Sequence, residues 1–226
     1  MNEKENKVIT INDHVKYSFT VTFVVLLTTG TIIFIEAIRT QTPMIRHIFN
    51  LETCISIIAS YFYSLFITEI ENPDKDFNWK SITKTRYLDW SITTPLMLLT
   101  LCLVLGSNIR IPLHLGIYVL IVIMNFSMLL IGYLGEVNHW DKIETSLFGF
   151  IPFFAMYAII FTQFIMPKYR LDNYILYGLF IFIWGMYGIV YLLNEEYKNI
   201  GYNILDLISK CFIGIGLWAY YTKIFV

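Results

Sequence analysis

The residues best suited to chemistry in this chain are a lysine and an aspartate in the last long apolar stretch. Lys210 lies well inside this stretch, and Asp206 precedes it by four residues. Residues four apart share one face of a helix, so the two side chains are expected to meet. A lysine at the centre of a membrane helix costs about 2.5–3.5 kcal/mol on insertion scales. The pair predicts either a structural ion pair or a lysine that binds an aldehyde as a Schiff base.

A second group of ionisable residues begins the third apolar stretch. Arg86 is followed by Asp89 and Thr93, at spacings that place side chains on one helix face. Asp89 and Asp206 are both expected to face Lys210, and Arg86 would then balance the charge. The alternative is a buried salt-bridge network that only fixes the packing of the helices.

The composition predicts an integral membrane protein. Of 226 residues, 57% are hydrophobic and 15% are charged. The net charge of −1 argues against a nucleic-acid partner. The three cysteines, Cys54, Cys102 and Cys211, lie in apolar segments without metal-ligand or disulfide spacing, so we expect inert thiols and no metal site.

Seven apolar stretches are long enough to cross a bilayer, which takes about 20 helical residues. They predict an all-α membrane protein, a seven-transmembrane helix bundle formed by a single domain over 1–226. The longest connection, Glu71–Thr85, contains Pro73 and is expected to form a small turn or hairpin outside the membrane. The predicted spans are Tyr17–Ile38, Phe49–Ile70, Tyr87–Gly106, Pro112–Leu134, Thr145–Met166, Asn173–Leu193 and Tyr202–Ile224.

The basic residues of the loops predict the orientation in the membrane. An odd number of spans puts the two termini on opposite sides. One set of loops has few acids and carries Arg39, Arg46, Arg110, Lys168 and Arg170 close to the helix ends. The other set mixes many acids with Lys75, Lys80, Lys84, Lys142 and Lys198. Because cytoplasmic loops are enriched in basic residues, we expect the N-terminus outside and the C-terminus in the cytoplasm.

Two motifs resemble those of a known family. The sequence RYLDWSITTPL at Arg86–Leu96 closely resembles the third-helix motif of microbial (type 1) rhodopsins. The sequence DLISK at Asp206–Lys210 resembles their last-helix motif, in which the lysine binds all-trans retinal. The resemblance covers all seven spans. The Ile/Asn/Lys/Tyr-rich composition and small loops are similar to the viral rhodopsin branch of this family.

The resemblance implies a role for each matching residue around the chromophore. Lys210 would form the Schiff base with retinal, Asp89 would be its counterion and proton acceptor, and Asp206 would be the second counterion. Tyr63 and Tyr187 would hold Asp206 by their hydroxyl groups, and Arg86 would lie on the extracellular side of Asp89.

A second set of residues would enclose the retinal. Trp90 and Trp184 would lie on either side of the polyene. The remaining implied pocket residues are Met97, Met128, Gly132, Pro152, Phe153, Met156 and Tyr191. Ordinary helix packing explains each of these residues taken alone, so it is their joint pattern that favours a cofactor pocket.

The chain departs from the family pattern at several positions. Gly188 stands where the sixth helix usually has proline, and Tyr191 stands where many members have tryptophan. Glu195 and Glu196, before the last helix, are expected to be solvated loop acids rather than a proton-release pair.

Transport depends on how a proton returns from the cytoplasmic side. Thr100 stands where typical outward proton pumps carry a donor carboxylate. Aligned through Tyr63, Glu52 stands where the hydroxyl partner of that donor normally lies. This pattern predicts that the donor carboxyl group has moved from the third helix to the second, where apolar surroundings would keep it protonated, as a donor must be. The alternative is a helix-end glutamate that reaches the interface, as expected for Glu36.

The leading hypothesis is a light-driven ion transporter, an outward proton pump that is not an enzyme. Asp89 and Thr93 disfavour sodium and chloride pumps. A light-gated cation channel is disfavoured by Ala59 and Cys211 at its gate positions, although Ser56, Ser60 and Asn203 leave this alternative open. A slow-cycling photosensor is the third possibility. The expected partners are retinal, the lipid membrane, protons or cations, and further copies of the chain in a trimer or pentamer.

Overall fold

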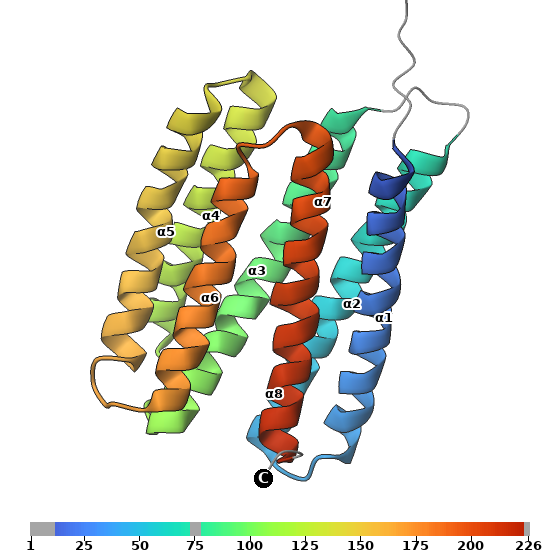
Figure 1. Cartoon of the computed structure of the whole chain (residues 1–226). Helices are drawn as coiled ribbons and strands as arrows, with labels where there is room; N and C mark the ends of the chain where they lie inside the picture. Colours follow the sequence, from blue (N-terminus) through green and yellow to red (C-terminus); the bar gives the residue numbers. More distant parts are fainter. Residues whose placement is uncertain (1–11, 73–77, 224–226) are drawn as a thin grey trace, which may run out of the picture.

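The computed structural model describes residues 12–72 and 78–223, which form seven membrane-spanning helical segments and no strand (Figure 1). The all-α seven-helix prediction is therefore confirmed. The first six segments are α1 (Asp13–Arg39), α2 (Pro43–Glu71), α3 (Trp79–Ile109), α4 (Leu115–Asn138), α5 (Lys142–Phe164) and α6 (Leu171–Val190). The seventh consists of α7 (Glu195–Asp206), a π-helical segment η1 (Leu207–Phe212) and α8 (Ile213–Thr222).

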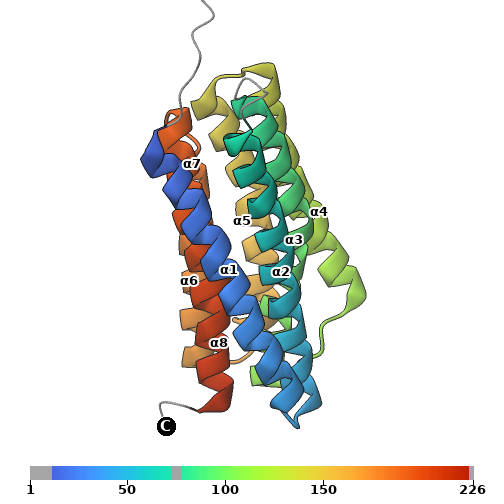
Figure 2. The ribbon, with the colours of Figure 1, turned by 90° about the vertical axis from the view of Figure 1, so that its right-hand side faces the viewer.

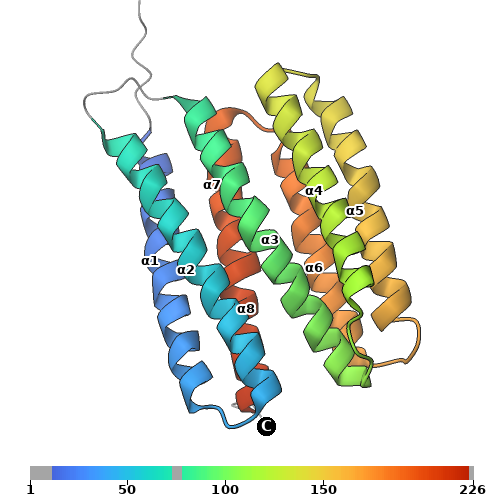
Figure 3. The same cartoon turned by 180° about the vertical axis from the view of Figure 1, so that it is seen from behind.

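The helices run alternately up and down, so that α1 begins at one end of the bundle and the C-terminus lies at the other (Figures 1 and 2). We call these the α1-start end and the C-terminal end. Seen from behind, α3 lies between α2 and α4 (Figure 3). The outward faces carry large exposed apolar side chains such as Phe34, Leu147 and Phe182. Apolar side chains of this kind suit contact with lipid. Each helix also satisfies its own backbone hydrogen bonds, as the interior of a bilayer requires.

Two helices begin well before their predicted starts. Helix α3 begins at Trp79 rather than Tyr87, because the Asn78 side chain accepts a hydrogen bond from the Lys80 amide at 2.9 Å and caps the first turn. Asn194 similarly accepts from the Tyr197 amide at 3.1 Å, so that α7 begins at Glu195.

Hydropathy detects the part of a helix that lies in lipid and misses polar turns that continue beyond it. Helix α2 likewise begins at Pro43, before its predicted start. Two boundaries shift the opposite way, since α4 begins at Leu115 and α6 ends at Val190, inside the predicted ranges. The predicted turn at Pro73 with Lys75, and the predicted helix end at Ile224, lie outside the described residues.

The apolar core divides into two main parts. The larger one joins α3, α5 and α6 and includes Leu98, Leu101 and Ile160. A smaller one joins α1 and α2 through Phe19 and Phe66. Buried polar residues are concentrated between these parts, where α3 faces α7 and η1.

Asn173 joins the start of α6 to two other helices. It is fully buried, and its amide nitrogen donates to the backbone carbonyls of Leu105 at 3.0 Å and Phe164 at 3.3 Å. Its side-chain oxygen accepts from Asn108 at 2.8 Å. These bonds satisfy carbonyl groups at the ends of α3 and α5, and they fix the position of α6.

The substitution Asn173→Ala is expected to destabilise the protein by about 1–3 kcal/mol, because buried carbonyl groups lose their donor. Thermal unfolding followed by circular dichroism measures this change. Asn138→Ala, at the exposed end of α4, is the matched control. Equal melting temperatures for the two variants would show that Asn173 does not anchor α6.

Candidate functional site

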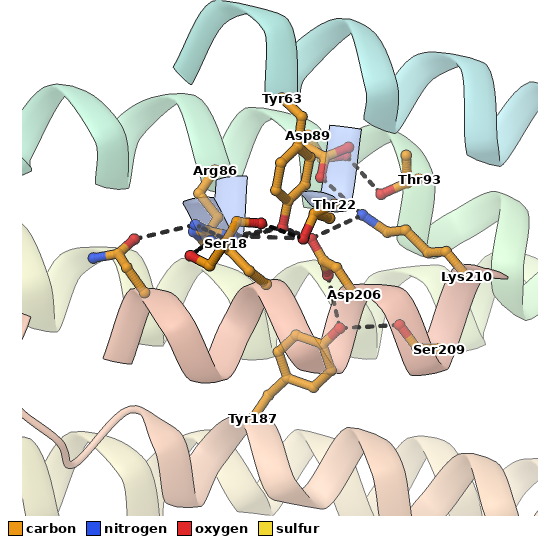
Figure 4. A network of polar contacts seen from close by, with 12 residues as sticks. Ser18, Thr22, Tyr63, Arg86, Asp89, Thr93, Tyr187, Asp206, Ser209 and Lys210 are labelled. Carbon is orange, nitrogen blue, oxygen red and sulfur yellow. Dashed lines mark hydrogen bonds and ion pairs between the residues drawn. The ribbon is translucent and has the colours of Figure 1, made fainter. Parts of the chain in front are cut away.

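Lys210 lies at the centre of the bundle, in the π-helical segment η1, and is 1% exposed. Its Nζ donates to Asp89 Oδ2 at 2.8 Å and lies 3.4 Å from Asp206 Oδ2 (Figure 4). Both aspartates are fully buried. The structure thus brings together the amine and the two carboxyl groups singled out in the sequence. Single π-helical turns within α-helices are frequent at functional sites.

Arg86 supplies a second buried cation on the α1-start side of the site. Its Nη1 lies 3.8 Å from Asp206 Oδ2 and donates to the Tyr63 hydroxyl at 3.3 Å. With Lys210 it balances the two aspartates. Removing one partner from such a buried pair typically costs about 3–5 kcal/mol, because an uncompensated charge remains.

Two tyrosine hydroxyls hold Asp206. Tyr63 donates to its Oδ2 at 2.9 Å, and Tyr187 donates to its Oδ1 at 2.7 Å. Asp89 is held less firmly. Its Oδ1 is buried and has no hydrogen-bond partner among the described residues, and Thr93 donates to the Asp89 backbone carbonyl at 2.9 Å. Asp89 therefore keeps a free oxygen at which it can accept a proton.

Two asparagines of α7 complete the network, and sequence reasoning gave them no role there. Arg86 Nη2 donates to Asn199 Oδ1 at 3.1 Å and to Asn203 Oδ1 at 2.9 Å. Asn203 Nδ2 donates to the Ser18 hydroxyl at 2.8 Å. The signal was present in the spacing, because positions 199, 203, 206 and 210 fall three or four residues apart on one helix face.

Glu195 differs from the expectation of a solvated loop acid. It lies in the first turn of α7, where Lys198 donates to its carboxylate at 2.8 Å. Lys198 is 2% exposed and also donates to Glu136 of α4 at 2.7 Å. The ammonium group therefore links α4 to α7, and Glu195 is ion-paired because the helix begins earlier than hydropathy indicates.

A largely apolar cavity ends at Lys210. Its wall includes residues of α3, α4, α5 and α6, and Asp206 and Ser209 lie with Lys210 at the polar end. Seven of the residues implied to enclose the retinal line it, together with Tyr187: Trp90, Met97, Met128, Gly132, Phe153, Trp184 and Tyr191. Pro152 and Met156 are buried in α5 but are not part of this wall, and Tyr63 acts on Asp206 instead.

The cavity suits retinal by its chemistry. A primary amine lies at one end between two carboxyl groups that can serve as counterions, and apolar and aromatic side chains form most of the wall. Gly188, unusual for its position, makes room on this wall. A Cβ there would lie 2.5 Å from Phe150 Cζ, so a larger residue would displace Phe150 from its place along the cavity.

Glu52 lies on the C-terminal side of Lys210 and is 3% exposed, which excludes a side chain that reaches the membrane interface. The Thr100 hydroxyl of α3 lies near this carboxyl group, is fully buried and makes no hydrogen bond within the described residues. A Cβ on Gly214 of α8 would lie 3.0 Å from Glu52 Oε2. The Glu52 carboxyl group is thus directed at the seventh helical segment, which also carries Lys210. The residue that it faces there, Gly214, follows Lys210 by four positions. Glu36, by contrast, pairs with the exposed Arg39 at 2.9 Å.

Comparisons with known proteins place the fold and the family of this chain. The chain is similar to the viral rhodopsin OLPVRII, for which there is a crystal structure. The two sequences are 42% identical, the match covers 95% of this chain and 100% of that one, and the TM-score is 0.87. It resembles the light-driven proton pump LR (Mac) of Leptosphaeria maculans in fold, with 17% identity, coverage of 95% and 98%, and a TM-score of 0.75.

A curated relative and a family model extend the comparison. Opsin-1 of Neurospora crassa is 29% identical in an alignment 150 residues long, and the match covers 58% of this chain and 47% of that protein. The model of the family described as bacteriorhodopsin-like protein matches residues 14–224. Its members are ion pumps, channels or photosensors rather than enzymes. The chain therefore belongs to the bacteriorhodopsin-like family of microbial rhodopsins.

Proposed function

We propose that this protein is a light-driven outward proton pump that carries all-trans retinal on Lys210. One observation carries the proposal. The Lys210 amine lies 2.8 Å from a carboxylate with a free oxygen, Asp89, and a second buried carboxyl group, Glu52, lies on its other side. In this proposal the α1-start end is extracellular and the C-terminal end is cytoplasmic.

Retinal bound at Lys210 supplies light absorption and a light-driven change of shape next to the nitrogen. The protein supplies the groups that move the proton. Trp90 and Trp184 line the cavity from α3 and α6, and the apolar wall keeps water away from it. The amine at the end of this cavity carries a proton in the dark, because two carboxylates stabilise its charge.

Release begins with transfer of that proton to Asp89. Its Oδ1 is the free acceptor in the site, whereas the Asp206 oxygens already accept hydrogen bonds from Tyr63 and Tyr187. Asp206 and Arg86 therefore remain charged and hold the network together. The polar side chains that follow toward the α1-start end, Asn203 and Asn199, give the proton an exit on the extracellular side.

Uptake uses Glu52 as the internal donor. Its apolar, water-poor surroundings favour the protonated carboxyl group, and the Thr100 hydroxyl lies near it without a hydrogen-bond partner of its own among the described residues. The pair is the reverse of the usual one, with the acid on α2 and the threonine on α3.

A second candidate function, a light-gated cation channel, is favoured by buried polar side chains between α1, α2 and α7, among them Thr22, Ser60 and Asn203.

Illumination of cells that express the protein with retinal is expected to acidify an unbuffered medium, because protons leave on the extracellular side. A protonophore should abolish the signal. Asp89→Asn removes the acceptor and should reduce acidification at least tenfold, whereas Asp13→Asn, exposed at the start of α1, should leave it unchanged. Undiminished acidification by Asp89→Asn would rule out the proposed acceptor.

Glu52→Gln should slow the return of a proton to the Lys210 nitrogen at least tenfold, because the internal donor is lost. Flash photolysis at the wavelength of the unprotonated pigment measures this rate. Azide, a small proton carrier, should restore it. Glu36→Gln is the matched control on the same side of the bundle. A rate unchanged by Glu52→Gln and insensitive to azide would remove Glu52 from the donor role.

Gly214→Ala should also slow this step, though less than Glu52→Gln. The added methyl group would lie 3.0 Å from Glu52 Oε2 and 2.9 Å from Ile33 Cδ1, so the carboxyl group must move. Gly216→Ala on the same helix is the control, because a Cβ there meets nothing within 4 Å. Identical kinetics for the two alanine variants would contradict the position assigned to the Glu52 carboxyl group.

A further inference from the structure

We propose that Ser56, Thr29 and Cys211 form the route by which a proton passes from Glu52 to Lys210, between α1, α2 and η1. The inference rests on the proposed donor role of Glu52 and adds residues to it. Helix α1 crosses in front of α2 and the α7–α8 segment, which places all three elements side by side (Figure 2).

The route begins where α1, α2 and α8 meet. Gly214 of α8 leaves room for both Glu52 and Ile33, since a Cβ there would lie 3.0 Å from Glu52 Oε2 and 2.9 Å from Ile33 Cδ1. The carboxyl group of Glu52 therefore lies at the level of Ile33 on α1. Because α1 runs toward the C-terminal end of the bundle, its residues that precede Ile33 lie nearer to the height of Lys210.

Ser56 marks the next level. It follows Glu52 by four residues on the same face of α2, and it is fully buried. A Cβ on Gly30 of α1 would lie 3.1 Å from Ser56 Cβ, so the two helices touch there. The Ser56 hydroxyl has no hydrogen-bond partner among the described residues.

This free hydroxyl is unusual for the helix. Four other hydroxyl side chains of α2 donate to carbonyl groups of their own helix at 2.7–2.9 Å: Thr53, Ser60, Ser64 and Thr68. Such bonds are the normal way to satisfy serine and threonine within a helix. Ser56 is not engaged in this way, so its hydroxyl is available to bind water or to pass a proton.

Thr29 and Cys211 bring the route to Lys210. Thr29 is 2% exposed and precedes Gly30, the α1 residue that meets Ser56. Cys211 of η1 is 1% exposed, lies near the Thr29 hydroxyl and is the neighbour of Lys210 in the chain. The buried polar groups therefore continue from the donor to the amine.

On the opposite side of the bundle, α3 packs against α5 and α6 through a mainly apolar layer that includes Leu98, Leu101, Ile160 and Ile183. Among the described residues, the buried members of this layer include the Cys102 thiol and the Tyr157 hydroxyl but no carboxyl group. The α1–α2 side, by contrast, holds the Glu52 carboxyl group with the Ser56 hydroxyl one turn away.

The proton balance is simple. The proton leaves the Glu52 carboxyl group and ends on the Lys210 nitrogen. Each hydroxyl or thiol along the route accepts one proton and releases another, since these groups both donate and accept hydrogen bonds. Water molecules that enter between the three side chains complete the contacts. Ser56, Thr29 and Cys211 are unchanged at the end, and Glu52 regains its proton from the cytoplasm.

The first test measures reprotonation of the Lys210 nitrogen after a flash. Ser56→Ala and Thr29→Val should each slow it at least fivefold, while Thr29→Ser keeps the hydroxyl and the normal rate. Thr53→Val, half-buried on the same helix as Ser56, is the control. Ser56→Ala should not lower the melting temperature, because the lost hydroxyl had no partner, so a slower rate would not reflect misfolding.

A second readout needs neither light nor retinal. The S–H stretching band of Cys211, identified by its loss in Cys211→Ala, should shift in the infrared spectrum of retinal-free Thr29→Val and stay in place in Thr53→Val. An unshifted band would overturn the route and leave the pump intact. The same conclusion would follow if reprotonation were normal in both Ser56→Ala and Thr29→Val but slow in Glu52→Gln. Normal reprotonation in Glu52→Gln would overturn the donor and the route together.

Discussion

A protonated amine in the middle of a bilayer must be matched by buried negative charge, and the rest of this structure follows from that constraint. Lys210 is paired with Asp89 and Asp206, and Arg86 brings the cluster close to neutrality. This charge pairing requires Asp89 of α3 and Lys210 of η1 to lie at the same depth in the bundle. A buried pair that loses one partner costs about 3–5 kcal/mol, so the register of these helices is strongly determined. Tyr63 and the polar face of α7 then hold the cluster from the remaining sides.

The same cluster makes the two ends of the bundle different. Toward the α1-start end, side-chain amides and Arg86 continue the polar network, whereas toward the C-terminal end most of the interior is apolar. Glu52 is the buried carboxyl group on that apolar side. In the proposed pump, a proton would leave Lys210 through the polar side and return from Glu52 on the apolar side. This asymmetry is what directional transport requires, and it arises from where a few polar residues lie rather than from the helix bundle itself.

Helical spacing made the centre of the site predictable, since Asp206 and Lys210 lie four residues apart and Arg86, Asp89 and Thr93 share one face. Neighbours across helices were harder to foresee. The contact of Gly214 with Glu52 and the space that Gly188 gives Phe150 depend on how helices distant in sequence approach each other. Hydropathy also missed the polar first turns of α3 and α7, which are fixed by asparagine caps, and so it placed Glu195 in a loop.

In the proposed pump, light drives a proton outward past Lys210 with Asp89 as acceptor and Glu52 as donor. Voltage-clamp recording of cells that express the protein with retinal separates this pump from a channel. A pump gives an outward photocurrent that keeps its sign at every membrane potential, because each photon moves charge in one direction. A photocurrent that reverses with membrane potential would contradict the pump and establish a channel.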